Sequence, residues 1–132
     1  MSVERQLASI ASLSMKKAKD VFIASGIRVG NQIITGSPVD KGTFINHWNT
    51  TINGIGYNVS QADDKSGSES RQELAAQFND INLGQFITFN NPMPYGKRLE
   101  YDGWSAKAPN GFVRINAAKW ESIVQEEVLK RR

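Results

Sequence analysis

The fold is decided by the stretch Asn90-Asn-Pro-Met-Pro-Tyr-Gly-Lys-Arg-Leu-Glu-Tyr-Asp-Gly-Trp-Ser-Ala-Lys-Ala-Pro-Asn-Gly-Phe-Val-Arg114. It contains three of the four prolines and three of the eleven glycines, a mixture that suits neither one long helix nor one strand. Pro94 fits the first position of a helix, where the N–H that proline lacks would have no partner. Gly103 fits the left-handed residue that closes a helix. We therefore expect a short helix at Tyr95–Tyr101, framed by turns, that joins packed elements.

A long helix is expected before this stretch, from Val3 to Thr35, because apolar residues recur there at helical spacing. Gly26 and Gly30 interrupt it, four positions apart and therefore on one face. They either kink the helix or let another backbone approach closely. Gly36 is the candidate left-handed residue that ends the helix.

Two strands and a polar loop are expected next. Aromatic and β-branched residues predict a strand at Asn46–Ile52, after a helical turn at Thr43–Asn46. Gly54–Gln72 is so poor in apolar residues that it predicts an exposed, mobile loop. A helix at Glu73–Asn79 and a strand at Gln85–Asn90 follow, the strand with alternate residues on opposite faces.

A second long helix is expected at Val113–Lys130, with an apolar stripe that includes Ala117, Trp120 and Ile123. The sum is a single α+β domain over residues 1–132. Its long N-terminal and C-terminal helices pack on a small antiparallel sheet, with a short helix in the Pro94–Gly103 stretch.

Composition sets further bounds on function. The 132 residues include no cysteine, which excludes a disulfide framework and a thiolate metal site. A net charge of +3 is too weak to argue nucleic-acid binding by itself. The N-terminus has no signal-peptide pattern, and no run approaches the roughly 18 apolar residues of a membrane span. We expect a protein made and kept in a cytoplasm, without a membrane partner.

Candidate catalytic residues are few. His47 is the single histidine, and one histidine without cysteine cannot supply the usual zinc ligands. Asp63 and Asp64 are adjacent but lack the spacing of a calcium loop. Glu100 is interpreted as half of an ion pair, because a catalytic carboxylate usually needs a second acid or a histidine beside it, and Asp102 would point elsewhere on a helix. We expect no enzyme, no cofactor and no metal.

A small basic and aromatic group leaves nucleic-acid binding open as an alternative. Lys97 and Arg98 lie in the short helix, and Lys130–Arg132 ends the chain. The aromatic residues near the first pair are Tyr95, Tyr101 and Trp104. Such residues can stack on bases, although core and interface packing explains them equally well.

Two motifs carry a resemblance. Gly36-Ser-Pro-Val-Asp-Lys-Gly-Thr-Phe-Ile-Asn-His-Trp48 resembles the pattern Pro-Val-Asp-Thr-Gly-x-Leu-x-x-Ser-Trp of neck and tail-completion (head–tail joining) proteins of long-tailed bacteriophages. The stretch Asn91–Arg114 is similar to that family's pattern Asn-x-x-Pro-Tyr-Ala-x-x-Leu-Glu-x-Gly-x-Ser-x-x-Ala-Pro-x-Gly-Met-Val-Arg. Lys41, His47 and the extra Asp102 depart from these patterns, and Phe44, Gly96 and Phe112 stand where the patterns have Leu, Ala and Met. The residues that match are Pro38, Val39, Asp40, Gly42 and Trp48, then Pro94, Tyr95, Leu99, Glu100, Gly103, Ser105, Pro109, Gly111, Val113 and Arg114.

The resemblance implies a virion structural protein that forms a ring at the head–tail junction. Its partners would be identical copies, six in the ring, and the neighbouring connector and tail-terminator or tube proteins. DNA would pass through the channel without sequence readout, and the Gly54–Gln72 loop would order against a neighbouring ring or line the channel. A tail-terminator or minor tail protein is the alternative within the virion. The residues expected to hold the structure or the interface are Pro38, Asp40, Gly42, Trp48, Pro94, Tyr95, Leu99, Glu100, Tyr101, Gly103, Trp104 and Arg114.

Overall fold

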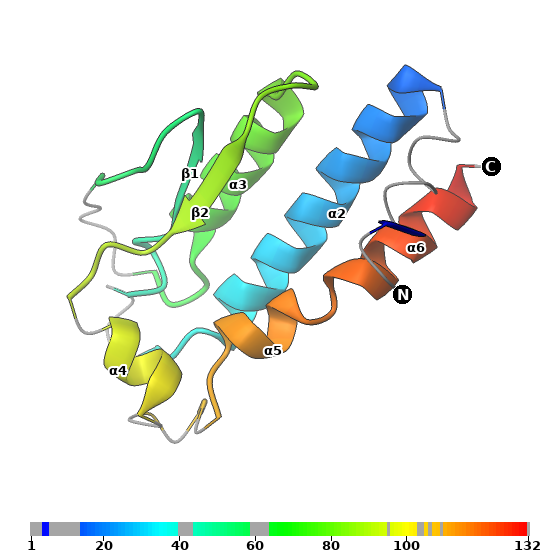
Figure 1. Cartoon of the computed structure of the whole chain (residues 1–132). Coiled ribbons are helices and arrows are strands. Elements are labelled where there is room, and N and C mark those ends of the chain that lie inside the picture. The colour runs from blue at the N-terminus through cyan, green and yellow to red at the C-terminus, as the bar shows by residue number, and fades with distance from the viewer. Residues whose placement is uncertain are drawn as a thin grey trace.

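The computed structural model describes residues 4–5, 14–39, 44–58, 64–94, 96–102, 105, 107–108 and 110–131. Within these residues the elements follow in the order α2 (Met15–Gly36), β1 (Asn49–Ile52), α3 (Ser68–Asp80), β2 (Ile87–Asn90), α4 (Gly96–Tyr101), α5 (Val113–Ala117) and α6 (Trp120–Lys130) (Figure 1). Helices combined with a two-stranded antiparallel sheet confirm the expected α+β fold class.

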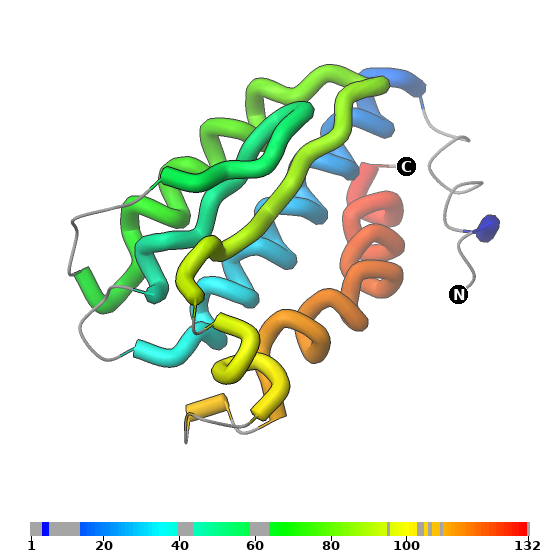
Figure 2. The backbone as a smooth tube through the Cα atoms, turned by 60° about the vertical axis from the view of Figure 1, so that its left-hand side comes forward, coloured from blue at the N-terminus to red at the C-terminus, as the bar shows by residue number. Residues whose placement is uncertain are grey.

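Helix α2 is the central element. It packs against α3 on one side and α6 on the other, while β1 lies against α3 (Figures 1 and 2). In the sheet, Asn49 lies opposite Asn90 and Ile52 opposite Ile87. One buried cluster joins α2, α3, α4 and the segment before β1 through Ile33, Ile34, Phe44, Ile45, Trp48, Leu74, Phe78, Leu99, Ala108 and Phe112. A smaller cluster of Val21, Val124 and Val128 joins α2 to α6.

The predicted first helix is present from Met15 onward, but the residue that caps its C-terminus differs from the prediction. The expectation that Gly36 closes the helix in a left-handed conformation is wrong, because Gly36 is the last residue of α2 and has no positive φ. Ser37 ends the helix. Its N–H donates to the Ile34 carbonyl (3.1 Å) and its Oγ donates to the Ile33 carbonyl (2.8 Å). These bonds give partners to last-turn carbonyls that would otherwise need a left-handed residue.

Gly26 and Gly30 have a packing role. A Cβ added at Gly30 would lie 2.6 Å from Cδ1 of Leu74, and one added at Gly26 would overlap the ring of Phe78. Both partners are buried residues of α3. The two glycines therefore let α3 approach α2 closely, and α2 continues through them as one helix to Gly36.

The predicted polar loop extends too far, because Ser68–Gln72 belongs to α3. The helix starts from a polar turn. The Asp64 carboxylate accepts hydrogen bonds from the N–H groups of Ser66 (3.0 Å) and Ser68 (3.2 Å), and Gly67 adopts a φ of +74° directly before the helix. A serine-rich run can start a helix when an acidic side chain satisfies its first donors. Residues 59–63 of the predicted loop lie outside the described residues.

The predicted C-terminal helix is two helices. α5 ends at Ala117 and α6 begins at Trp120, with a tight turn between them. Asn116 is buried and donates to the carbonyls of Phe112 (2.6 Å) and, across to α2, Gln32 (3.4 Å). This fixes the end of α5 on α2. Ala117, expected in the apolar stripe, is exposed, because the break turns α6 relative to α5.

The predicted strands are shorter in the structure. The expected turn is present at Phe44–Asn46, with Thr43 outside the described residues, and β1 begins only at Asn49. The predicted alternation in the second strand is confirmed. Ile87 and Phe89 pack against the main core, whereas Phe86, directly before β2, is 60% exposed.

Candidate functional site

Four aromatic rings join the two motifs to the sheet. Trp48, from the first motif, stacks on Phe89 of β2 with ring centroids 4.6 Å apart and planes 3° from parallel. Phe44 and Phe112 meet Trp48 edge-on at 5.8 and 6.3 Å, and they meet each other at 5.8 Å. Phe112 belongs to the second motif. Such stacked and edge-to-face pairs add to the free energy gained by burial, so this cluster is the packing centre of the site.

Polar contacts fix the orientation of the Trp48 ring. Its Nε1–H donates to Oγ of Ser37 (2.9 Å), which donates in turn to the Ile33 carbonyl. The backbone N–H of Trp48 donates to Oγ of the buried Ser70 (3.1 Å), and that hydroxyl donates to the Ile45 carbonyl (2.7 Å). The buried indole and the two hydroxyls therefore all have partners, as low-dielectric surroundings require.

Glu100 holds the second motif together. One carboxylate oxygen accepts from the N–H groups of Phe112 (2.7 Å) and Val113 (2.9 Å). The other accepts from the N–H and Nε of Arg114 (2.9 and 2.8 Å). Burial by itself raises the pKa of Glu100, but these hydrogen bonds outweigh it and hold the pKa below its usual value. The carboxylate thus ties α4 to the start of α5.

Gly111 makes this closure possible. Its φ is +92°, and a Cβ built there would lie 2.9 Å from the Glu100 carbonyl oxygen and from both carboxylate oxygens. Only glycine combines this backbone conformation with this close approach at low cost.

Arg114 and Tyr101 form the solvent side of the site. The Arg114 guanidinium carbon lies 4.4 Å from the centre of the Tyr101 ring. The Arg114 side chain is 53% exposed, and Tyr101 as a whole residue is 59% exposed. Beside them is a surface pocket of about 370 Å³ whose lining includes Phe44, Trp48 and Phe112. The buried rings therefore reach the surface next to an exposed cation–π pair.

The structure brings together part of the predicted set of site residues. Trp48, Leu99 and Glu100 are buried, Pro38 is buried at the end of α2, and Pro94, Tyr101 and Arg114 are exposed. The predictions for Asp40, Gly42, Tyr95, Gly103 and Trp104 fall outside the described residues. Sequence reasoning missed Ser37, Ser70 and Phe89. Ser37 had a usable signal in its place directly after a helix, but no local pattern shows that Ser70 and Phe89 reach Trp48.

The residues tested for other chemistry have structural contacts. His47 is buried, and its backbone N–H donates to the Phe44 carbonyl (3.0 Å). The Asp64 carboxylate is used by the turn before α3. In the described part of the chain, no three His, Cys, Asp or Glu residues gather as metal ligands.

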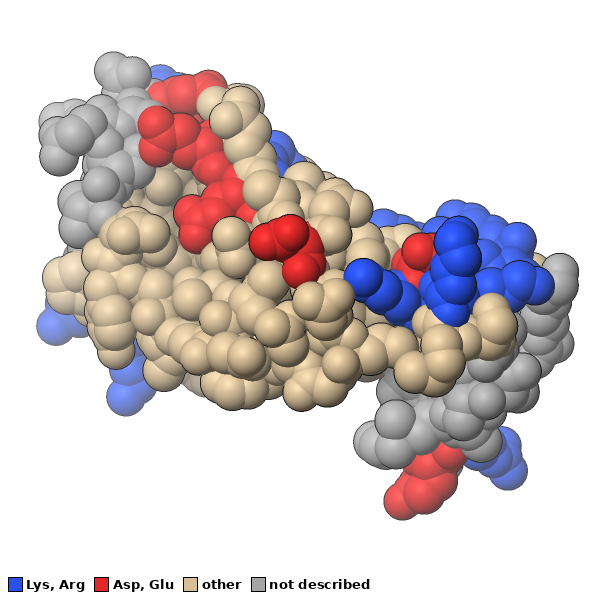
Figure 3. Space-filling view, turned by 90° about the horizontal axis from the view of Figure 1, so that it is seen from above, with Lys and Arg blue, Asp and Glu red and all other residues tan. Residues whose placement is uncertain are grey.

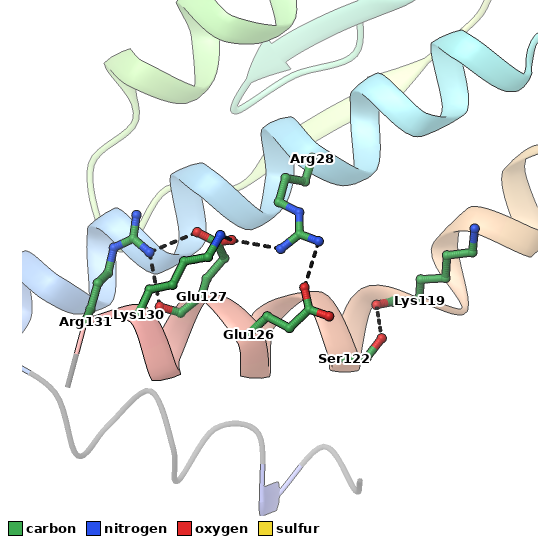
Figure 4. A network of polar contacts seen from close by, with 7 residues as sticks. All are labelled: Arg28, Lys119, Ser122, Glu126, Glu127, Lys130 and Arg131. Carbon is green, nitrogen blue, oxygen red and sulfur yellow. Dashed lines mark hydrogen bonds and ion pairs between the residues drawn. The ribbon is translucent and has the colours of Figure 1, made fainter.

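The basic C-terminus takes part in an ion-pair network on α6 (Figure 4). The Glu127 side chain is 4% exposed and pairs with Arg28 of α2 (2.8 Å), Lys130 (2.9 Å) and Arg131 (2.9 Å). Arg28 also pairs with Glu126 (2.8 Å). Burial raises the pKa of Glu127, but the hydrogen bonds from the three cations dominate and lower it to about 2. Two of the cations considered for nucleic-acid binding thus compensate a buried carboxylate.

Comparisons with family models, curated proteins and solved structures found no match to this chain. Among the described residues, no helix combines the length and the apolar character needed to cross a membrane.

Proposed function

We propose that this chain is a virion structural protein of a long-tailed bacteriophage, acting as a neck or tail-completion protein. Identical copies, six by the resemblance, close into a ring around the DNA channel and join the connector to the tail. The proposal rests on the two sequence motifs, and one structural observation supports it: the two segments that contain the motifs pack together. Trp48 from the first motif and Phe112 from the second lie in one aromatic cluster.

The roles of the matched residues fit a shared scaffold. Glu100, Gly111 and Arg114 form one closed unit in which the carboxylate accepts three backbone N–H groups and the Arg114 side chain. Such a unit has to be kept wherever this turn is kept, because losing any part leaves a buried group without its partner. A resemblance concentrated on these residues is therefore what two chains with the same fold would share.

The same contacts support a role without catalysis. A general acid or base needs a carboxylate that can exchange a proton with a substrate. Both oxygens of Glu100 are occupied by donors, and its pKa is held below the usual value. Glu100 is better suited to stabilising the α4–α5 connection than to proton transfer.

The exposed pair of Tyr101 and Arg114 supplies a contact surface for the next ring subunit. Tyrosine and arginine are common anchors of protein interfaces, because both bury a large area and still form polar contacts. Here they lie beside a pocket of about 370 Å³ that can receive a side chain of a neighbour. A ring contact of this kind joins two different surfaces of identical subunits.

Electron microscopy of particles made without the protein tests the proposal. A nonsense codon in its gene is expected to give separate DNA-filled heads and free tails, and purified wild-type protein added to the lysate restores joined, infectious particles. Tyr101→Ala and Trp104→Ala are expected to fail in this complementation, whereas Tyr57→Ala, at another position 72% exposed, succeeds. Joined particles without the protein, or its absence from purified virions by mass spectrometry, would refute the proposal.

A further inference from the structure

The two edges of the small sheet differ in whether their outward backbone groups have hydrogen-bond partners. On the outer edge of β1, the N–H of Thr50 donates to Oε1 of Glu73 (3.1 Å), and just before the strand the N–H of Trp48 donates to Oγ of Ser70 (3.1 Å). Both acceptors belong to α3. Helix α3 therefore covers this edge and satisfies donors that would otherwise attract another strand.

Among the described residues, no side chain is bonded in this way to the outer edge of β2. The N–H of Asn53 donates to the Phe86 carbonyl (2.8 Å), which fixes the alternation along the ladder. Thr88 and Asn90 therefore direct their backbone groups to β1, while Ile87 and Phe89 direct theirs outward. In the part of the chain that the structure describes, these outward N–H and C=O groups have no hydrogen-bond partner.

The usual means of blocking an edge are largely missing here. Charged residues, prolines and bulges keep exposed edges from pairing. Residues 81–94 contain no Lys, Arg, Asp or Glu, the prolines follow the strand, and the register with β1 is unbroken. Residues 44–58 also lack charge, and the space-filling view shows a broad surface without charged side chains (Figure 3). The shortness of β2 is the remaining protection.

We propose that β2 pairs antiparallel with β2 of a second copy of the chain, about a two-fold axis that passes beside Thr88. In this register Ile87 lies opposite Phe89 of the second copy, and Phe89 opposite Ile87. Each of these two pairs exchanges both of its backbone hydrogen bonds, so all outward groups of both strands are satisfied by four bonds. Thr88 faces its own counterpart across the axis.

The side chains fit this occupant. On the core face, Ile87 meets Phe89 of the second copy and extends the apolar layer across the axis. On the outer face, the 60% exposed Phe86 comes opposite Asn90. Self-pairing sets every charge on a strand against its own copy, and here there is no charge to repel. Two-fold contacts of this kind are the commonest in homo-oligomers.

The inference goes beyond the proposed function, because a two-fold contact cannot itself close a ring of subunits joined head to tail. It concerns the free protein, in which it covers an edge prone to aggregation. Since each strand is short, the dimer is weak and depends on concentration.

Sedimentation velocity across protein concentrations of roughly 1 µM to 1 mM, the range of weak interfaces, tests the pairing. We expect Thr88→Lys and Thr88→Glu each to weaken the dimer about tenfold, because like charges then meet across the axis. An equimolar mixture of the two variants restores it, because lysine then faces glutamate. Ile115→Lys, at a 47% exposed position on α5, is the control and leaves dimerisation unchanged. Circular dichroism checks that each variant is folded.

Amide exchange supplies a second measurement. The amides of Ile87 and Phe89 are expected to exchange more slowly as concentration rises, while that of Thr88, already bonded to β1, does not change. A wild-type protein that stays monomeric up to about 1 mM would overturn the inference. So would an oligomer that is insensitive to both Thr88 variants, or a mixture that fails to restore pairing. None of these results bears on whether the protein joins heads to tails, so the two proposals fail independently.

Discussion

Glu100 and Gly111 lie so close that a side chain on Gly111 would displace the carboxylate of Glu100. A Cβ at position 111 would lie 2.9 Å from each carboxylate oxygen, and the backbone there has a φ of +92°. With the backbone turned in this way at Gly111, the N–H groups of Phe112, Val113 and Arg114 donate to the Glu100 carboxylate. The geometry of the α4–α5 connection therefore depends on glycine at position 111.

Gly111→Ala should lower the free energy of unfolding by roughly 3 kcal/mol, because it combines a left-handed backbone with a clash against Glu100. Gly84→Ala is the matched control. Gly84 has a φ of +99° but nothing within 4 Å of an added Cβ, so only the backbone term applies there, on the order of 1 kcal/mol. Urea denaturation of both variants gives the comparison. Equal losses at the two positions would contradict the proposed contact with Glu100.

Glu100→Gln should cost about 2 to 4 kcal/mol of stability, since a neutral amide replaces a buried anion and brings its own N–H₂ against backbone donors. Asp80→Asn, an exposed carboxylate at the end of α3, is the control and should change stability by about 0.5 kcal/mol or less. Thermal and urea unfolding measure both. A loss below about 1 kcal/mol for Glu100→Gln would mean that the carboxylate does not hold the connection.

Local patterns were enough to predict the order of the elements from α2 to α4, although not the division of the last helix into α5 and α6. The spacing of apolar residues gave α2, and the Pro94 and Gly103 frame gave α4. What local patterns could not give was the partner of each polar residue. Ser68 to Gln72 has the composition of a loop and becomes helical because Asp64 satisfies the first donors and Ser70 is buried against Trp48. The first of these contacts spans four positions, but the contact between Ser70 and Trp48 spans 22, which no local pattern can show.

The contacts within the candidate site could not be predicted from local patterns either. Trp48 and Glu100 were selected from motifs, but their contacts with Ser37, Phe89 and the N–H groups after Gly111 emerge only when the chain has folded. The break before α6 is similar. The periodic pattern continues through Ala117, whereas the buried Asn116, bonded to the Phe112 carbonyl and to Gln32 of α2, holds the end of α5 against α2.

Gly30→Ala should destabilise the protein by about 1 to 3 kcal/mol, although alanine favours helices by roughly 1 kcal/mol over glycine. The reason is the 2.6 Å separation between an added Cβ and Cδ1 of Leu74, which forces α2 and α3 apart. Leu74→Ala in the same chain removes the clash, so the double variant should lose less than the sum of the single losses. Calorimetry of the three variants tests this. A stabilised Gly30→Ala would show that the helices do not pack at this position.

The Glu127 network predicts how stability depends on acidity. The pKa of Glu127 is about 2 in the folded chain against an ordinary 4.5, because Arg28, Lys130 and Arg131 donate to it despite its burial. A lowered folded-state pKa means that the unfolded chain binds the proton more readily. The stabilisation, about 3 kcal/mol, is therefore complete above about pH 5 and is lost as the pH falls toward 2.

Glu127→Gln should remove this part of the pH dependence, so that the difference in unfolding free energy between wild type and variant is large at pH 6 and shrinks steadily below about pH 4.5. Glu126→Gln is the control, because the Glu126 side chain is 58% exposed and, among the described residues, pairs only with Arg28. It should leave the shape of the profile almost unchanged, as exposed ion pairs contribute roughly 0 to 1 kcal/mol. Urea unfolding across this pH range measures all three proteins. If the wild type and Glu127→Gln lose stability in parallel as the pH falls, Glu127 is not the carboxylate whose protonation weakens the contact between α2 and α6.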